Sequence, residues 1–190
     1  NLPQLVSGFN NYSKKASGNF FRKICKKIIY TNIIEAELIK LFSNAYRYIH
    51  FSISNQFYMI CNKENLNFEK IRLIMRDGYS RNTNIPTSGF SAGPCLLKDT
   101  MQLSSFYNHK LPLGHSAMKI NQNMPKFIFK ELEKKYNLKN KTIGLLGLAF
   151  KAETDDIRDS LAIELQKILK SKKIKTLVSD EYYKDKKNVK

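Results

Sequence analysis

Residues 31–61, TNIIEAELIKLFSNAYRYIHFSISNQFYMIC, decide the fold of this chain. The stretch holds neither proline nor glycine, and apolar residues recur on most of its faces. This pattern predicts a long, largely buried helix. Its polar exceptions fall on one narrow stripe, which indicates a wet cleft beside the helix. The members of the stripe are Glu37, Lys40, Asn44, Arg47 and Asn55.

The residues that follow this helix predict a shorter helix and then a loop. Residues 67–75 have helical spacing that turns Phe68, Ile71 and Ile74 inward. Residues 82–94 are rich in glycine and proline, so they are expected to form a loop.

Helical spacing resumes at Cys95, which places this cysteine in the first turn of the next helix. Pro112 is expected to end that helix, because proline disrupts a helix interior. Residues 116–136 then predict a further amphipathic helix with a basic last turn.

The hydrophobic period changes near the C-terminal end of the chain. Residues 142–148 form a short apolar run, residues 156–169 have helical spacing, and residues 174–178 predict a second short strand. A strand, a helix and a strand in this order predict a βαβ unit, the beginning of a parallel sheet. The sequence from 137 to 190 is too short to complete such a domain.

Composition and charge indicate a globular, basic protein. The chain has 190 residues, 42% of them hydrophobic, and a formal charge of +17. Such an excess of positive charge attracts anions, including nucleic acid, acidic membranes and phosphorylated small molecules. Because the lysines are scattered and the densest runs, such as 184–190, fall at expected helix ends or an exposed tail, we interpret most of them as a solvated surface.

Cysteine usage and hydropathy limit the cellular setting. Three cysteines at wide spacings fit neither a disulfide framework nor paired metal ligands, so a reducing, cytoplasmic setting is expected and no metal site is predicted. The charged residues within 31–61 interrupt the apolar run of about 18 residues that a membrane helix needs. No membrane association is therefore expected.

The chemistry centres on Cys95. A thiol at a helix N-terminus meets the positive end of the helix dipole, which favours the nucleophilic thiolate. Asp99 follows one turn later on the same face, and Lys40 and Asn44 could supply a cation and an amide donor to an oxyanion or a water. The alternative for Cys95 is a buried structural thiol.

Three motifs in order resemble one family. They are EAELIKLFSNA at 35–45; the glycine-rich cysteine loop with Gly89-Phe90, Gly93, Cys95 and Lys98-Asp99; and FKAETDDIRDS at 150–160. Together they are similar to the UDP-glucose/GDP-mannose dehydrogenases, and the resemblance runs from about Leu2 to Tyr183. Gln56 and the Ser91-Ala92 pair depart from the family pattern, where a glutamate and a second glycine are common.

The resemblance implies a fold. It implies a mainly α central dimerisation domain over 31–136, with helices like those of the 6-phosphogluconate dehydrogenase C-terminal domain. The start of an α/β, Rossmann-like UDP-binding domain would follow over 137–190. Residues 1–30 would be the tail of an NAD-binding domain. The dinucleotide fingerprint G-x-G-x-x-G does not occur in the chain, so this chain alone is not expected to bind NAD normally or to be active.

The resemblance also implies an activity, the NAD-dependent oxidation of the C6 alcohol of a UDP-sugar to the uronate. The reaction would pass through a thioester on Cys95. Lys40, Asn44 and Asp99 would stabilise oxyanion charge and position the hydrolytic water. Which sugar is oxidised stays open, whether of the glucose, N-acetylglucosamine or N-acetylmannosamine type.

Further residues take roles from the same resemblance. Arg158 is expected to contact NAD, although it could simply pair with Asp155 or Asp159. The helix at 31–61 is expected to form a homodimer. The residues expected to bind the UDP-sugar are Arg81, Gly89, Phe90, Gly93, Lys98 and Lys151.

Two alternatives from other classes remain. The charge and the aromatic residues among the lysines are compatible with a basic nucleic-acid-binding module, but no recognisable binding motif accompanies them. The apolar helix at 31–61 could also serve a non-catalytic dimerisation module.

Overall fold

The computed structural model describes residues 2–183, and the lysine-rich run 184–190 lies outside the described residues. The chain separates into two compact units, Asn1–Asn44 and Ala45–Lys190. Each unit is described by itself. The domain bounds expected from the sequence stay predictions.

The first unit contains a small parallel βαβ arrangement. Strand β1, Gln4–Val6, pairs in parallel with β2, Ile28–Tyr30, and helix α1, Asn11–Phe21, connects them. Asn10 caps α1 by accepting from the Ser13 backbone N–H at 2.8 Å, while the Ser13 hydroxyl accepts from the Asn10 backbone N–H. This reciprocal capping satisfies two backbone donors at the start of the helix.

Helix α2, Ile33–Lys63, confirms the helix predicted over 31–61. It begins with a capping pair: Asn32 Oδ1 accepts from the Glu35 backbone N–H at 2.8 Å, and the Glu35 carboxylate accepts from the Asn32 backbone N–H. The Thr31 hydroxyl also donates to the Glu35 carboxylate and is the main reason that the pKa of Glu35 is lowered.

The prediction that this helix is largely buried is wrong for the single chain. Its buried residues are small or polar for the most part, while many of its large apolar residues are exposed. The reason is that one chain covers only one side of α2, whereas the hydrophobic pattern extends over most of its faces. Asn55, expected in a wet cleft, is fully buried. The exposed apolar residues of α2 are Ile34, Ile39, Phe42, Tyr46, Ile53, Phe57 and Ile60.

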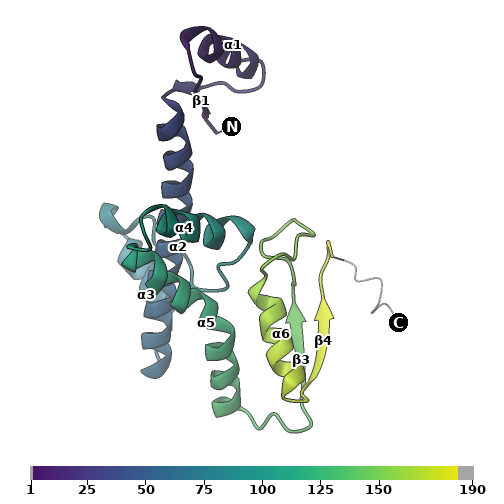
Figure 1. Cartoon of the computed structure of the whole chain (residues 1–190). Helices are drawn as coiled ribbons and strands as arrows, with labels where there is room; N and C mark the ends of the chain where they lie inside the picture. Colours follow the sequence, from purple (N-terminus) through teal and green to yellow (C-terminus); the bar gives the residue numbers. More distant parts are fainter. Residues whose placement is uncertain (1, 184–190) are drawn as a thin grey trace. The chain divides into compact units, whose positions relative to one another are not determined.

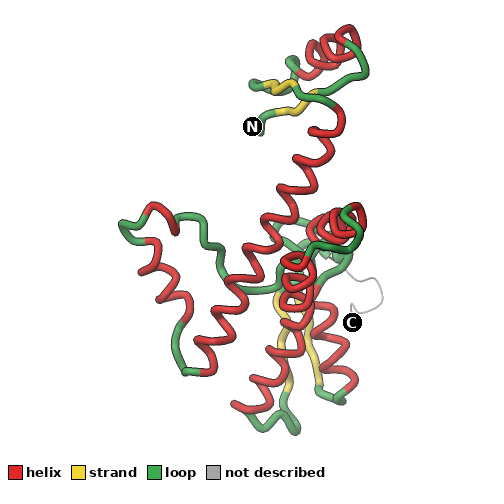
Figure 2. The backbone as a smooth tube through the Cα atoms, turned by 60° about the vertical axis from the view of Figure 1, so that its left-hand side comes forward, coloured by secondary structure: helices red, strands yellow, loops and turns green. Residues whose placement is uncertain are grey.

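Helix α3, Phe68–Arg76, confirms the second predicted helix and turns back from the C-terminal end of α2 (Figure 2). Asn67 caps it. Phe68 is buried as predicted, but Ile74 is 64% exposed, so its predicted inward position is wrong. No segment of the described chain covers that side of the short helix. A 3-10 turn, η1, Ser80–Asn82, follows.

Helix α4, Pro94–Phe106, places Cys95 in its first turn, as predicted. Helix α5, Pro112–Lys135, follows it. The role predicted for Pro112 is wrong, and so is the start of the next helix at 116. Helix α4 already ends at Phe106, because Asn108 and His109 shortly after it adopt left-handed backbone angles. Pro112 instead begins α5, a position where its missing N–H costs no hydrogen bond.

The predicted strand, helix and strand are β3, Thr142–Leu146; α6, Leu161–Ser171; and β4, Lys175–Ser179. The strands are parallel and lie side by side next to α6 (Figure 1). The helix begins five residues later than predicted, because Ser160 caps it and the preceding residues form a loop. Phe129, Leu145, Leu165 and Leu169 form a core cluster that joins α5 to this βαβ unit.

The mainly helical part and the parallel βαβ unit confirm the fold class predicted from the sequence. Among residues 2–183, no helix combines the length and apolar character required to cross a membrane. All three cysteines are free thiols, with Cys61 buried and Cys95 exposed.

Candidate active site

Cys95 lies exposed in the first turn of α4, directly after Gly93 and Pro94. Gly93 caps this helix with φ 101°, a backbone angle that L residues rarely adopt. A Cβ at this position would also lie 2.5 Å from the Phe150 ring. Both the angle and the space therefore require glycine immediately before the cysteine helix.

The cysteine loop, residues 83–93, is anchored to α2 and α3 at three successive points. The Arg72 guanidinium donates to the Ile85 carbonyl at 3.0 Å, and the Ser54 hydroxyl donates to the Pro86 carbonyl at 2.8 Å. The third point is Gly89, where Asn55 accepts from the backbone N–H at 2.8 Å and donates to the carbonyl at 3.0 Å.

A second carboxamide supports the first. Asn121 on α5 accepts from Asn55 Nδ2 at 2.9 Å and donates to the Tyr48 carbonyl at 3.1 Å. No role is predicted for Asn121 from the sequence, and Asn55 is predicted only as part of a polar stripe. Because Asn55 and Asn121 are 66 positions apart, their contact leaves no signal in the local sequence. The hint available was that Asn121 is a polar residue on the apolar side of the helix predicted over 116–136.

The end of the cysteine loop, residues 90–92, turns its side chains into the protein. Phe90 packs against the core cluster, so this residue could reach a substrate only through its backbone. Ser91 is buried, and its Oγ has no hydrogen-bond partner among the described residues.

Asp99 and Lys98 occupy opposite environments one turn after Cys95. Asp99 is 1% exposed, whereas the Lys98 side chain is 67% exposed. Lys98 Nζ lies 4.0 Å from Asp99 Oδ1. The buried carboxylate is therefore accompanied by a cation on the solvent side.

The β3–α6 loop, residues 147–160, contains the third motif and approaches the cysteine loop at the contact between Phe150 and Gly93. Its first residues are held by Asp180, whose Oδ2 accepts from the Leu148 and Ala149 backbone N–H groups. These bonds, the one from Leu148 above all, lower the pKa of Asp180 to about 2.

Arg158 pairs with Asp156, neither of the two partners considered from the sequence. Arg158 Nη2 lies 2.6 Å from Asp156 Oδ2, and Arg158 Nε bonds both carboxylate oxygens. The hydrogen bonds from Arg158 lower the pKa of Asp156 to about 2. The bond to Asp156 is also the main cause of the raised pKa of Arg158, and the charge of Cys95 adds to it. Arg158 and Cys95 therefore lie within electrostatic reach of each other.

Lys151 is exposed, with Nζ 5.7 Å from the centroid of the Phe150 ring. Cys95, Gly93, Phe150, Lys151 and Arg158 thus belong to one neighbourhood, although their motifs lie more than 50 positions apart in the sequence.

The sequence also predicts Lys40, Asn44 and Arg81 for the site. Lys40 and Asn44 lie one turn apart on α2 in the first unit, and Arg81 is exposed in η1. Their meeting with Cys95 stays a prediction.

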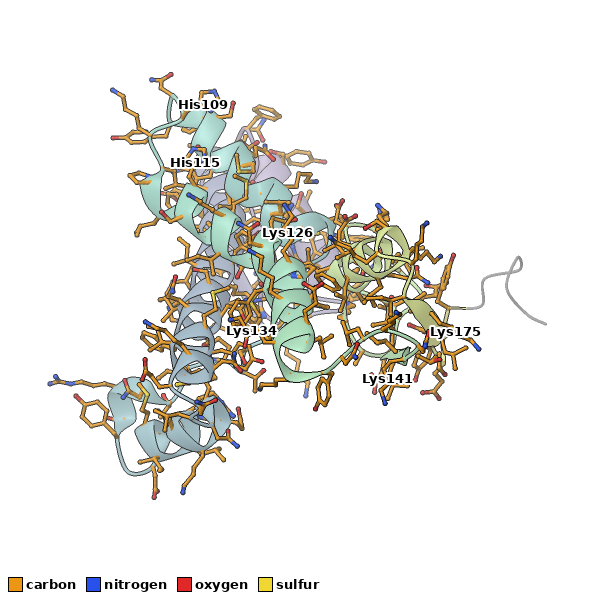
Figure 3. The ribbon with its side chains drawn as sticks, turned by 90° about the horizontal axis from the view of Figure 1, so that it is seen from below. His109, His115, Lys126, Lys134, Lys141 and Lys175 are labelled. Atoms are coloured by element: carbon orange, nitrogen blue, oxygen red, sulfur yellow. The ribbon has the colours of Figure 1, made fainter. Side chains whose placement is uncertain are left out.

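A hollow of about 830 Å³ lies at the end of the β3–β4 sheet where both strands begin. Lys141 and Lys175, which Figure 3 labels near one another, come from the amino ends of the two strands and help to line it. The β3–α6 loop leaves the carboxyl end of β3, so this basic hollow is separate from the neighbourhood of Cys95.

Two profiles of one family match the chain. The UDP-glucose/GDP-mannose dehydrogenase family, central domain, matches residues 34–123, and the UDP binding domain of the same family matches residues 144–190. The class is that of nucleotide-sugar dehydrogenases, which are oxidoreductases. The chain belongs to the UDP-glucose/GDP-mannose dehydrogenase family.

Curated relatives and solved structures agree with this membership. The chain is 30% identical to the UDP-N-acetyl-D-mannosamine dehydrogenase of Pyrococcus horikoshii, over 94% of this chain and 44% of that protein. It is 32% identical to the UDP-glucose 6-dehydrogenase of Campylobacter jejuni, over 97% of this chain and 48% of that protein. The solved UDP-D-ManNAc dehydrogenase of Pyrococcus horikoshii superimposes with a TM-score of 0.83 at 28% identity, covering 96% of this chain and 45% of that one. The chain thus spans about half the length of these relatives.

Proposed function

We propose that the protein to which this chain belongs oxidises the C6 alcohol of a UDP-sugar to the carboxylate with NAD, using Cys95 as the nucleophile. The observation that carries this proposal is the exposed Cys95 in the first turn of α4, beside the backbone of a glycine-containing loop and within reach of the Arg158 charge. The dehydrogenase names of the relatives support the reaction class.

The reaction removes four electrons from one carbon atom. Oxidation of the alcohol gives an aldehyde, and the Cys95 thiolate adds to its carbon to give a thiohemiacetal. Loss of a hydride from that carbon gives a thioester. Water then attacks the acyl carbon, the carbon–sulfur bond breaks, and the carboxylate and the free thiol are released.

Lys40, Asn44 and Asp99 are proposed to serve the oxyanion and the water. An ammonium and an amide N–H stabilise negative charge on the former aldehyde oxygen. A buried carboxylate accepts a proton from the attacking water, which is general base catalysis. The burial of Asp99 supports this role, since a carboxylate in a water-poor site must be held by defined partners.

The proposed UDP-sugar contacts come from both loops. Gly89 presents backbone with open space where a Cβ would stand, which allows close approach of a sugar. Gly93, whose Cβ position is filled by the Phe150 ring, is proposed to contribute only its backbone. Exposed Lys98, Lys151 and Arg81 are cations for the diphosphate, and Phe90 contributes its backbone. The match of residues 144–190 to a UDP-binding domain supports a UDP-sugar as the ligand.

The described residues fit NAD at one point, the exposed Arg158. Its Nε and Nη2 bond Asp156, which leaves Nη1 for an anionic group of the dinucleotide. When bound, NAD supplies the hydride acceptor for both oxidations. A reducing compartment, the cytoplasm, suits a catalytic thiol of this kind.

We also propose that α2 contacts a second copy of the chain. Ile53, Phe57 and Ile60 recur at helical spacing and are all exposed, so the single chain leaves an apolar side of α2 in water. Sedimentation of the protein at low micromolar concentration should give a dimer. A strict monomer would count against this interface.

The test of the reaction is the Cys95→Ser variant of the intact protein, assayed for uronate from UDP-glucose and from UDP-N-acetylmannosamine. We expect acid formation to be abolished, because a serine hydroxyl is far less nucleophilic than a thiolate at neutral pH. Cys25→Ser is the matched control and should retain activity. Unchanged uronate turnover in Cys95→Ser would end the proposal.

The 190-residue chain by itself is expected to produce no NADH from either UDP-sugar. It contains no dinucleotide fingerprint, so the hydride acceptor would not be held beside the substrate. Robust NADH production, followed by absorbance, would contradict this expectation.

A further inference from the structure

The cysteine loop meets the rest of the second unit through a buried pair of carboxamides. We propose that Asn55 and Asn121 are positioning residues that fix the Gly89 backbone, and with it the loop that leads to Cys95; the catalytic part of this proposal rests on the function proposed above. Neither residue touches the reacting atoms. Both act through the loop.

The contact between Asn55 and Gly89 is a two-point match. Asn55 Oδ1 accepts from the Gly89 N–H at 2.8 Å, and Asn55 Nδ2 donates to the Gly89 carbonyl at 3.0 Å. Gly89 lies in a bend with a φ of 150°, so this contact is not a strand pairing. A primary amide offers one acceptor and one donor, so a single Asn55 side chain satisfies both backbone groups of Gly89.

Asn121 determines which way the Asn55 amide faces. Asn121 Oδ1 accepts the second N–H of Asn55 at 2.9 Å, and Asn121 Nδ2 is in turn bonded to the Tyr48 carbonyl. If the Asn55 amide were flipped, its oxygen would face the Asn121 oxygen and the Gly89 carbonyl oxygen, and its NH2 group would face the Gly89 N–H. Asn55 and Asn121 are both fully buried, so water could not compensate for the mismatch between them. One orientation therefore remains.

Within the described residues, Gly89 is the last position of the loop with a hydrogen bond from α2 before the cysteine helix begins. Four residues later Gly93 caps α4 against the Phe150 ring. The path between these two points is short, so a shift of Gly89 is transmitted to the approach to Cys95. Reacting groups tolerate little displacement, since an error of about 1 Å can cost about a hundredfold in rate.

Two serines near Asn55 on α2 make it possible to distinguish positioning of the cysteine loop from stabilisation of the helix. Ser54 anchors the same loop at Pro86, three residues before Gly89. Ser52 is buried on the same helix, and within residues 2–183 its hydroxyl bonds the Ile49 carbonyl of that helix and no residue of the loop. Ser52→Ala is therefore a matched control that removes a buried hydrogen bond from α2 without touching the loop.

The kinetic test compares Asn55→Ala, Asn121→Ala and the double variant of the intact protein with Ser52→Ala. The readouts are kcat and KM with UDP-glucose and UDP-N-acetylmannosamine, at a temperature where circular dichroism shows every variant folded. We expect each Asn variant to lower kcat/KM by about tenfold or more, and the double variant to lose little beyond the worse single one. Ser52→Ala should change it by less than about twofold.

Two outcomes overturn the kinetic part. One is that Asn55→Ala lowers the melting temperature as Ser52→Ala does, while kcat/KM of the folded protein is unchanged. The other is that the effects of the two Asn variants simply multiply in the double variant, which would mean that Asn121 does not act through Asn55.

A second measurement does not depend on the enzyme activity. Exchange of the Gly89 backbone N–H with solvent, followed by NMR, should accelerate about tenfold or more in Asn55→Ala and stay unchanged in Ser52→Ala. If the unmodified protein oxidises no UDP-sugar but this exchange responds, the proposed function fails while the anchor at Gly89 stands. If the exchange does not respond, the anchor itself is rejected.

Discussion

The cysteine loop and the β3–α6 loop contact each other at Gly93 and Phe150, yet they are held by different chemistry. A neutral hydroxyl and a neutral amide, both buried, hold the first at Pro86 and Gly89, and the Arg72 guanidinium, which stays charged at ordinary pH, holds it at Ile85. Carboxylates nearer the solvent hold the second, through Asp156 and Asp180. Neutral buried bonds do not respond to pH, whereas carboxylate bonds do. Cys95, the proposed nucleophile, therefore follows the less pH-sensitive of the two loops.

The largest effect is expected where the loops touch. Gly93→Ala should lower the free energy of unfolding by about 2 to 5 kcal/mol, because it adds both a positive-φ strain and a clash with the Phe150 ring. The measurement is urea denaturation of the intact protein.

Adding Phe150→Ala to Gly93→Ala separates the two causes. Removing the ring should relieve the clash but leave the backbone strain, so only part of the loss should be recovered. Full recovery would show that φ at Gly93 is not a constraint, and the loops would then depend on packing alone.

Asp180→Asn should cost about 1 to 2 kcal/mol at neutral pH, since the amide retains only one of the two accepting oxygens and the site is partly solvent-screened. The pKa of Asp180 is lowered to about 2 in the folded protein, against about 3.9 when unfolded. Its contribution is therefore complete above about pH 4 and is lost as the pH falls toward 2. The difference between the two proteins, measured by denaturation across this range, should shrink accordingly; a constant difference would remove the contrast between the loops.

A serine pair sharpens the comparison inside the cysteine loop. Ser54→Ala should lower the free energy of unfolding by about 1 kcal/mol, because it also leaves the Pro86 carbonyl without its donor. Ser91→Ala should be neutral or stabilising by up to about 1 kcal/mol, since its buried hydroxyl has no bond to lose among the described residues. Thermal melts of both variants test this, and the opposite ranking would contradict it.

The smallest effect is expected at the exposed ion pair. Arg158→Ala should raise the pKa of Asp156 from about 2 toward its usual value, because the guanidinium supplies the main hydrogen bonds to that carboxylate. Carbon NMR of the labelled carboxyl group measures this titration. High salt should diminish the shift in the unmodified protein. An unchanged pKa would mean that Asp156 is held by backbone instead.

Much of the fold could be predicted because it is encoded locally. The spacing of apolar residues predicted α2 and the order β3, α6, β4, and it placed Cys95 in a first turn. The errors occurred where local rules compete. Pro112 was read as a helix end, although proline suits a helix start equally well. Ile74 and the apolar residues of α2 were assigned to an interior that a single chain does not provide.

The residues of the candidate site likewise fall into those that the sequence indicates and those that it does not. The start of a helix predicted Cys95 and Asp99, and the family resemblance implied Lys151 and Arg158, but neither indicated the partner of Arg158, which is Asp156. Neither indicated Asn121, because its partner lies on another helix, 66 positions away in the sequence.

The helices, the parallel strands, the place of Cys95 at a helix start and the family could all be inferred from the amino-acid sequence. These depend on periodicity, capping residues and short motifs, all of which act over a few neighbouring residues. Only the tertiary structure decided that Asn55 and Asn121 hold the cysteine loop, and that Gly93 is pressed against Phe150. Those contacts join residues 34 to 66 positions apart, and their energy comes from burial that exists only once the chain has folded.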